Sequence, residues 1–420
     1  LDPYEGEIIG RPYPLKSSRL RFFGGTSGHW GGWVKPLDEE DFNTWPVSYT
    51  EVYKYLPAAH KILEIDDVGY DGSSLTADKL IDTQDSKFFR TSNFQFSPPT
   101  RFGEKYRNRI KKSKKIYCAL NTNLLQIKRD KDGVSTKLTV KTVSGSIQTI
   151  HGRAFVLAMG GIENPRYLLQ SNLHLSNKYG TDHLGKCFMD HFALNTSLIY
   201  SKKGLLYSRF KYDNKMVKPV ISPSRRLLTE RKINNVMMDF IPTAGDNSVV
   251  GDNYIKNPGL FDPSINEHEG GFYQLITTSS NSPSPKSSVT LSNKIDINGI
   301  NRVRLNWHIP DKDFRNIVKT VEIFANYLGQ NGLGRLRKIQ HSVLEKPSVG
   351  MHHMGTTRMS SSENSGVCDT NCKCFNSKNL FIAGSSVFPT AGYANPTLTI
   401  VCLSVRLANH INSELSNGGL

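Results

Sequence analysis

The segment GMHHMGTTRM, residues 350–359, places two histidines side by side in a chain that has 12 of them. A neutral imidazole can take up a proton near physiological pH and can also bind a metal. His352 and His353 are therefore candidates for a general base or for metal ligands, and they would also suit a polar turn between glycines. The residue types alone leave these three roles open.

Three of the six cysteines cluster in CDTNCKC, residues 368–374. A zinc site usually needs two closely spaced cysteine pairs, or cysteines with histidines at similar spacing. Here the three cysteines are separated by three residues and by one residue, with no second pair nearby. We therefore expect free thiols in a reducing compartment and no bound metal. A metal-dependent hydrolase that uses the two histidines and these cysteines is an alternative, and the lack of a carboxylate ligand pattern argues against it.

A glycine-bearing loop near the C-terminus leads into a helix. NLFIAG, residues 379–384, is typical of a buried strand, and an irregular loop follows it. Asn395-Pro396-Thr397 then predicts a helix start, with asparagine at the N-cap and proline in the first turn. The N-terminus of such a helix can stabilise negative charge on a ligand, although an ordinary capped core helix has the same local pattern.

The surrounding elements indicate an α/β fold with an inserted sheet. In residues 153–170, AFVLAM predicts a buried strand, GG a tight turn and ENPRYLLQ a helix. Residues 116–150 alternate like strands, with turns at KDG and SG. The middle of the chain combines short alternating strands with one helix, which predicts a mostly antiparallel sheet with a covering helix. The apolar positions of that helix are Ile317, Val321, Phe324 and Leu328.

Composition excludes several classes of protein. Hydrophobic residues make up 37% and charged residues 21%, as in globular proteins, and no apolar run is long enough to span a membrane. The net charge of +16 is spread along the chain. Its densest basic patch, residues 106–117, lacks interleaved aromatics, so we interpret it as a solvated helix face and expect no nucleic-acid partner. No signal peptide is visible, and the expected free thiols favour the cytoplasm.

Five segments, taken together, resemble the glucose-methanol-choline (GMC) flavin oxidoreductases. HHMGTTRM is similar to that family's His-x-x-Gly-Thr-x-x-Met segment, and residues 366–411 resemble its C-terminal signature. GGTSGHWGGW is similar to its flavin-contacting loop, AMGGIENPRYLL to its second signature, and HLGKCFMDHF to a further family segment. The segments follow the family's order. The GGTSGHW loop is most similar to the branch that contains pyranose oxidase and related sugar dehydrogenases.

The resemblance implies FAD-dependent oxidation of the CH–OH group of an alcohol. By motif alignment, His352 is the histidine that faces the flavin N5 and takes the hydroxyl proton, and Asn395 occupies its partner position. An asparagine amide can hold a developing alkoxide, while the cofactor accepts the hydride. Asn395 and the loop favour a sugar or polyol as substrate. The electron acceptor, O2 or another compound, and the oligomeric state stay open.

The same motifs imply the contacts to FAD and the domain limits. The expected cofactor-binding residues are Gly24, Gly25, Thr26, Ser27, His29, Trp30, Leu124, Gly160, Gly384, Ser385, Asn395, Pro396 and Thr397. In the pyranose oxidase branch the histidine of the HW pair is bonded to the flavin, so His29 is a candidate for a covalent link, with noncovalent contact as the alternative. We expect the FAD-binding domain over 1–190 and 346–420 and the substrate-binding domain over 191–345.

One part of the family pattern has no counterpart in the sequence. The family opens with a strand, a GxGxxG turn and a helix that hold the FAD diphosphate. The chain begins at Leu1 and contains no GxGxxG, so we expect a Rossmann-like domain without its first βαβ unit. Weak FAD binding follows from this expectation. The alternative function is a truncated, non-catalytic GMC remnant.

Overall fold

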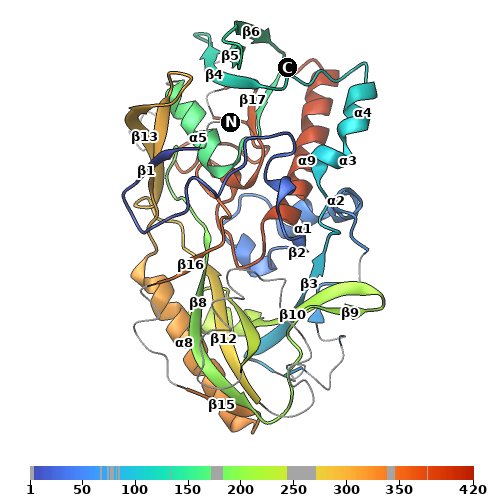
Figure 1. Cartoon of the computed structure of the whole chain (residues 1–420), viewed down its shortest axis with the longest axis vertical. Helices are drawn as coiled ribbons and strands as arrows, with labels where there is room; N and C mark the ends of the chain where they lie inside the picture. The colour runs from blue at the N-terminus through green and yellow to red at the C-terminus, as the bar shows by residue number, and fades with distance from the viewer. Residues whose placement is uncertain are drawn as a thin grey trace.

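The structure is a computed structural model that describes residues 4–66, 69–72, 75, 80, 81, 83, 86–132, 134–171, 183–243, 271–337, 346–375 and 377–420. Residues 244–270 and 338–345 of the predicted substrate-binding domain lie outside this set. The molecule is elongated, with a large sheet at one end, a three-stranded sheet at the other, and helices α5 and α9 between them (Figure 1).

The large sheet has nine strands, paired antiparallel in the order β15-β8-β12-β11-β10-β3-β2, with β16 beside β8 and β9 beside β10. The strands are β2 (Trp33–Val34), β3 (Phe89–Phe96), β8 (His191–Ser201), β9 (Phe210–Tyr212), β10 (Lys215–Pro223), β11 (Met237–Thr243), β12 (Gly271–Ser280), β15 (Gly334–Leu336) and β16 (Ser348–Val349). Helix α8 (Asp311–Gln330) covers it, and its four predicted apolar positions are all buried. The predicted antiparallel sheet with a covering helix is confirmed.

Two short parallel strands form the centre of the other half. β7 (Phe155–Leu157) pairs with β17 (Leu380–Ile382), with Phe155 opposite Leu380. Helix α5 (Gly160–Gln170) follows β7, whereas β17 leads through the turn η6 (Ser385–Val387) to helix α9 (Thr397–Ser416). The strands and helices expected from the sequence are therefore present. Because carboxyl ends of parallel strands meet at one edge, the turns after β7 and β17 lie together.

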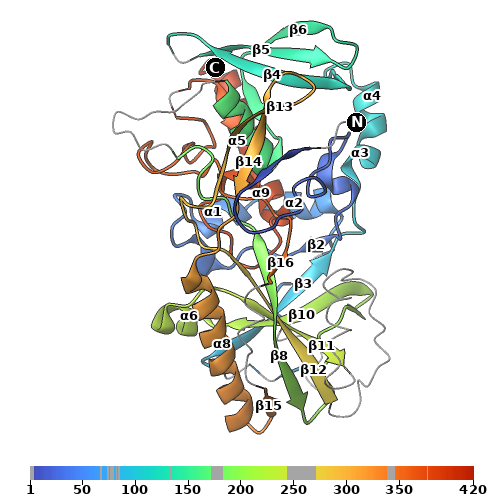
Figure 2. The same cartoon turned by 60° about the vertical axis from the view of Figure 1, so that its left-hand side comes forward.

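Two smaller sheets complete this half. β4 (Thr122–Arg129), β5 (Ser135–Thr142) and β6 (Ile147–His151) form the antiparallel sheet seen at the top of Figure 2. β1 (Gly6–Ile8) runs parallel to β14 (Asn301–Asn306), which pairs with β13 (Ser288–Ile295). The remaining helices within the described ranges are η1 (Gly25–Gly28), η2 (Glu39–Phe42), α1 (Tyr49–Tyr53), α2 (Leu56–Leu63), α3 (Phe102–Lys105), α4 (Arg107–Lys112) and α6 (Arg225–Arg231).

Strand pairing crosses the predicted domain boundaries, which stay a prediction. β2 and β3 precede residue 190 but belong to the large sheet, and β13 and β14 follow residue 191 but pair with β1. Within the described ranges, β7 has β17 as its only strand neighbour, and Val156 on β7 is 45% exposed. The basic stretch forms α4 with no buried residue, as expected for a solvated helix. No helix in the described ranges is both long and apolar enough to cross a membrane.

Candidate active site

The two predicted catalytic residues meet where the large sheet joins the parallel strands. His352 follows β16, which pairs with β8 next to His191, and Asn395 precedes α9. The His352 Nε2 atom lies 3.3 Å from the Asn395 Nδ2 atom. On the other side of the ring, His352 Nδ1 lies 2.8 Å from His191 Nδ1. Three segments far apart in the sequence thus converge on one imidazole.

The carboxylate of Asp190 fixes the backbone that carries His352. It accepts hydrogen bonds from the Tyr13 hydroxyl (2.6 Å) and from the main-chain N–H groups of His191 (2.7 Å), Met351 (3.0 Å) and His352 (2.7 Å). Burial raises the pKa of Asp190 to about 7, and these bonds oppose the rise. Because every partner is a donor, the arrangement suits an ionised carboxylate. Met351 is held at a φ of 58°, which turns the chain sharply before His352.

Burial keeps the histidines of this region neutral. It lowers the pKa of His352 to about 4, and together with the neighbouring His352 it lowers the pKa of His191 to about 3. The pKa of His353 also falls to about 3, chiefly through burial. A neutral His352 is the form that can accept a proton.

His353 points away from its neighbour. Its ring packs against Tyr13 and Phe188, with centroid distances of 5.8 and 5.9 Å, and its main-chain oxygen accepts a hydrogen bond from Ser385 Oγ (2.7 Å). The two histidines therefore do not converge on one point, as a shared metal would require. In the described ranges, no group of three or more His, Cys, Asp or Glu side chains is arranged to hold a metal ion. The three clustered cysteines are buried free thiols.

The turns after β7 and β17 form an open backbone surface. Gly160 and Gly384 have φ values of 83° and 107°, and a Cβ atom added to either would meet nothing within 4 Å. Asn164 ties the turns together, since its Nδ2 donates to the oxygen atoms of Ala383 (3.2 Å) and Ser386 (2.9 Å). Ser385 lies at the same edge and bonds the segment that carries the histidines. These predicted cofactor residues are thus brought together with the histidine segment.

The predicted flavin loop, residues 24–30, is anchored by the chain at 100–103. Arg101 donates to the main-chain oxygens of Ser27 and Trp30 (both 3.0 Å), and the Trp30 indole donates to the Thr100 oxygen (2.9 Å). The His29 side chain is exposed. Gly25 has a φ of 55° and open space where a Cβ would stand. Leu124, on β4, packs against the hydrophobic core of this half.

The prediction that Asn395 caps helix α9 was wrong by one residue. The helix begins at Thr397 with Pro396 at the N-cap, and no side chain caps it. The Asn395 amide instead lies against His352. Contact with the histidine thus takes the place of the cap.

The loop before Asn395 contacts the side chains of His191 and Asp41. The Gly392 carbonyl accepts a hydrogen bond from His191 Nε2 at 3.0 Å. Gly392 has a φ of 52°, and a Cβ there would lie 2.2 Å from the Asp41 carboxylate. Burial, with the neighbouring charge of Asp38, raises the pKa of Asp41 to about 7.

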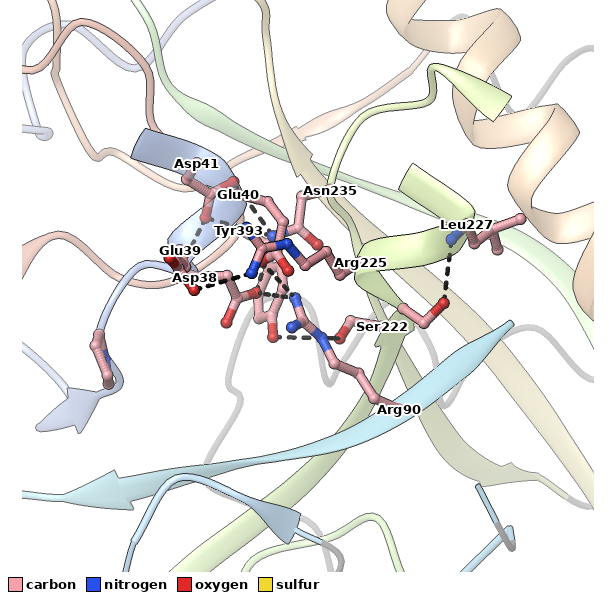
Figure 3. A network of polar contacts seen from close by, with 12 residues as sticks. Asp38, Glu39, Glu40, Asp41, Arg90, Ser222, Arg225, Leu227, Asn235 and Tyr393 are labelled. Carbon is pink, nitrogen blue, oxygen red and sulfur yellow. Dashed lines mark hydrogen bonds and ion pairs between the residues drawn. The ribbon is translucent and has the colours of Figure 1, made fainter. Parts of the chain in front are cut away.

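A buried polar network contacts this loop through Tyr393 (Figure 3). Asp38 pairs with Lys35 (2.5 Å) and with Arg90 (2.9 Å), and Asn235 donates to both Asp38 (2.8 Å) and Asp41 (3.2 Å). The residues come from η2 and the segment before it, from β3 and from the segment before β11. The network therefore joins the large sheet to the segment beneath the Asn395 loop.

Sequence reasoning missed Asp190, His191 and Tyr13. The first two lie in HLGKCFMDHF, which supported the resemblance without receiving a role. The adjacent acid and histidine in that segment were the available signal. Tyr13 stands in no motif, so its contact with Asp190 required the folded chain.

The chain is similar in sequence to several known proteins. Residues 283–404 match the GMC oxidoreductase family model for the C-terminal region. The chain is 26% identical over 304 residues to 2-methyl-1,2-propanediol dehydrogenase of Mycolicibacterium austroafricanum, covering 68% of this chain and 53% of that protein. It is 42% identical over 72 residues to C-glycoside 3-oxidase of Arthrobacter globiformis, covering 17% of this chain and 14% of that protein. The chain thus spans about half the length of the dehydrogenase and less of the oxidase.

Solved structures share the fold. A formate oxidase superposes with a TM-score of 0.60 at 16% identity, covering 98% of this chain and 88% of that one. Pyridoxine 4-oxidase from Mesorbium loti superposes with a TM-score of 0.55 at 14% identity, covering 94% and 84%. The family match, these folds and the motifs around His352 and Asn395 point the same way: residues 283–404 match the C-terminal model of the GMC oxidoreductases, and the chain as a whole resembles that family.

Proposed function

We propose that the chain is a FAD-dependent oxidoreductase that oxidises the CH–OH group of an alcohol, in particular a sugar or polyol. The observation that carries the proposal is the contact of a half-buried, neutral His352 with Asn395. The relatives' names support the substrate class, since they include a propanediol dehydrogenase and a glycoside oxidase. Anaerobic addition of sugars and polyols to the FAD-loaded chain tests it. Bleaching of the flavin supports the proposal, and bound FAD that no CH–OH donor bleaches contradicts it.

The chain's own residues fit the flavin part of FAD. GMC oxidoreductases bind FAD, which supplies a hydride acceptor when bound. The open glycine turns at Gly160 and Gly384 and the loop at 24–30 present backbone to a ligand, and they would hold the cofactor. The sequence contains no GxGxxG turn for the diphosphate. A second candidate function is a non-catalytic GMC remnant.

His352 and Asn395 have different roles toward the substrate hydroxyl. The hydroxyl donates its hydrogen to His352 Nε2, which takes the proton as general base. The Asn395 amide N–H donates to the oxygen as negative charge develops on it. The N-terminus of α9, which begins two residues later, favours negative charge in the same place. Loss of the proton makes the carbinol C–H a better hydride donor.

The low pKa of His352 predicts an unusual pH dependence. Because the base must be neutral and its pKa is about 4, we expect kcat/KM to stay level from pH 7 down to 5.5 and to fall as the pH drops through 4. An ordinary histidine with a pKa of about 6.5 would be only about one-tenth neutral at pH 5.5. The measurement is a pH profile of alcohol-dependent turnover, with circular dichroism at each pH as the control for folding. A tenfold loss at pH 5.5 in folded protein contradicts the expectation.

Cofactor content gives a further prediction. We expect the 420-residue chain to purify without stoichiometric flavin, because its sequence has no GxGxxG turn for the diphosphate. The visible absorbance of the purified protein measures this, before and after incubation with excess FAD. A flavin band at full occupancy in the untreated protein would defeat the expectation.

The linkage at His29 can be tested on the FAD-loaded chain. The imidazole is exposed on the loop at 24–30, and we expect noncovalent contact from this loop. Acid precipitation should then release the flavin into the supernatant. Colour retained in the washed pellet, and lost in a His29→Ala variant, would instead establish a covalent bond.

A further inference from the structure

We propose that His191 is a positioning residue that places the ring proton of His352 on Nδ1 and so keeps Nε2 free as the base. The inference deepens the proposed function and rests on it. It starts from an uncommon contact, in which the Nδ1 atoms of the buried His191 and the half-buried His352 lie 2.8 Å apart. One of the two nitrogens must donate and the other must accept, so the question is what sets the direction.

The Gly392 carbonyl determines which ring nitrogen of His191 is protonated. Its oxygen can only accept a hydrogen bond, and it lies 3.0 Å from His191 Nε2. His191 Nε2 therefore carries a proton. Because burial keeps His191 neutral, its other nitrogen, Nδ1, is a bare acceptor.

The tautomer of His191 in turn determines the tautomer of His352. A bare Nδ1 on His191 requires the proton of the contact to sit on His352 Nδ1. His352 is also neutral, so its Nε2 carries a lone pair. That lone pair faces the Asn395 amide nitrogen at 3.3 Å, which is a donor. The last nitrogen in the chain of bonds, His352 Nε2, is thus unprotonated, and it is the atom that must accept the substrate proton.

The opposite tautomer is disfavoured at both ends. It would place two lone pairs opposite each other at the Nδ1 contact, and it would place the Nε2 proton against the hydrogens of Asn395 Nδ2. A buried acceptor left without a donor costs free energy. The rings meet edge to face, at 81° between planes, and Asp190 holds the main chain of both histidines. The geometry therefore leaves little freedom for either ring to turn over.

Two substitutions separate the contacts of His191. His191→Gln places an amide near the former Nε2 position, so it can still reach Gly392 but loses the contact with His352. His191→Asn places an amide oxygen near the former Nδ1 position, so it can still accept from His352 Nδ1. His151→Gln, at an exposed histidine on β6, is the matched control.

Nitrogen NMR of the full chain, labelled with ¹⁵N-histidine, reports which ring nitrogen is protonated. The His352 signals are assigned by their loss in His352→Gln. We expect Nδ1–H in the wild type, in His191→Asn and in the control, and loss of this single tautomer in His191→Gln. In FAD-loaded protein, His191→Gln should lower kcat on the order of 100-fold with little change in KM, as for other residues that orient a histidine. His191→Asn should lose less than about tenfold.

The NMR measurement needs neither flavin nor turnover, so its outcome is separate from that of the proposed function. An Nε2–H tautomer in the wild type, or an unchanged Nδ1–H tautomer in folded His191→Gln, overturns the inference. Should His191→Gln fail to fold, His191→Asn decides, because an Nε2–H tautomer in that variant also overturns it. A chain that shows the expected tautomers but oxidises no alcohol refutes the proposed function alone.

Discussion

Replacing His352 with glutamine is expected to slow the reduction of bound FAD by an alcohol by about 10³-fold. Glutamine approximates the size and polarity of the imidazole but cannot take the hydroxyl proton. The loss should appear in kcat as well as in kcat/KM, because the proton is transferred as the reaction proceeds. Anaerobic mixing of the FAD-loaded variant with substrate measures the rate directly.

His353→Gln is the matched control for this experiment. His353 is adjacent in sequence, and its ring packs against Tyr13 and Phe188 instead of facing Asn395. We expect the substitution of His353 to change the rate of flavin reduction by less than about tenfold, because His353 does not accept the substrate proton. Equal losses in the two variants, or an unchanged rate in His352→Gln, would remove the role assigned to His352.

Replacing Lys35 with methionine is expected to destabilise the fold by about 3 kcal/mol. The Lys35 side chain is 3% exposed and pairs with the buried carboxylate of Asp38. Burial disfavours the charged amine, but the charge of Asp38 outweighs this effect and holds the pKa of Lys35 above its ordinary value. Methionine keeps most of the volume and leaves Asp38 and Asp41 with less positive charge around them. Denaturant unfolding followed by circular dichroism measures the change.

The control for this prediction is an exposed ion pair near the same network (Figure 3). Arg225 pairs with Glu39 at 3.2 Å, and the two side chains are 66% and 59% exposed. We expect Arg225→Met to cost less than about 1 kcal/mol, because water already solvates both charges. If Lys35→Met is as mild as Arg225→Met, the buried network does not support the Asn395 loop in the way described.

Much of the fold follows from local sequence patterns. The apolar run before Gly160 and the one before Gly384 predicted β7 and β17, and the helical spacing from Ile317 to Leu328 predicted α8. These patterns record burial on one face or on both faces of an element, which a single segment already contains. The contact of His352 with Asn395 followed from motif resemblance instead, since no local pattern joins residues 43 positions apart.

The remainder of the site depends on tertiary pairing. His191 contacts His352, 161 residues later in the sequence, because β8 pairs with β16. The register of this pairing cannot be predicted from either segment alone. In the same way, β3 joins the large sheet by pairing with β10, more than 100 residues away, and β2 joins it by pairing with β3. The stretch from Lys35 to Asp41 has the composition of an exposed turn, yet the packing of distant elements buries Lys35 and Leu37 within it.

The central claim is that this site removes hydrogen from a carbinol carbon and passes its proton to His352. The most direct measurement is the anaerobic bleaching of bound FAD by a sugar or polyol, compared with the same compound carrying deuterium at the carbinol carbon. We expect bleaching that deuterium slows in the wild type, and almost no bleaching with either compound in His352→Gln. Bleaching at equal rates in the wild type and in His352→Gln would contradict this claim.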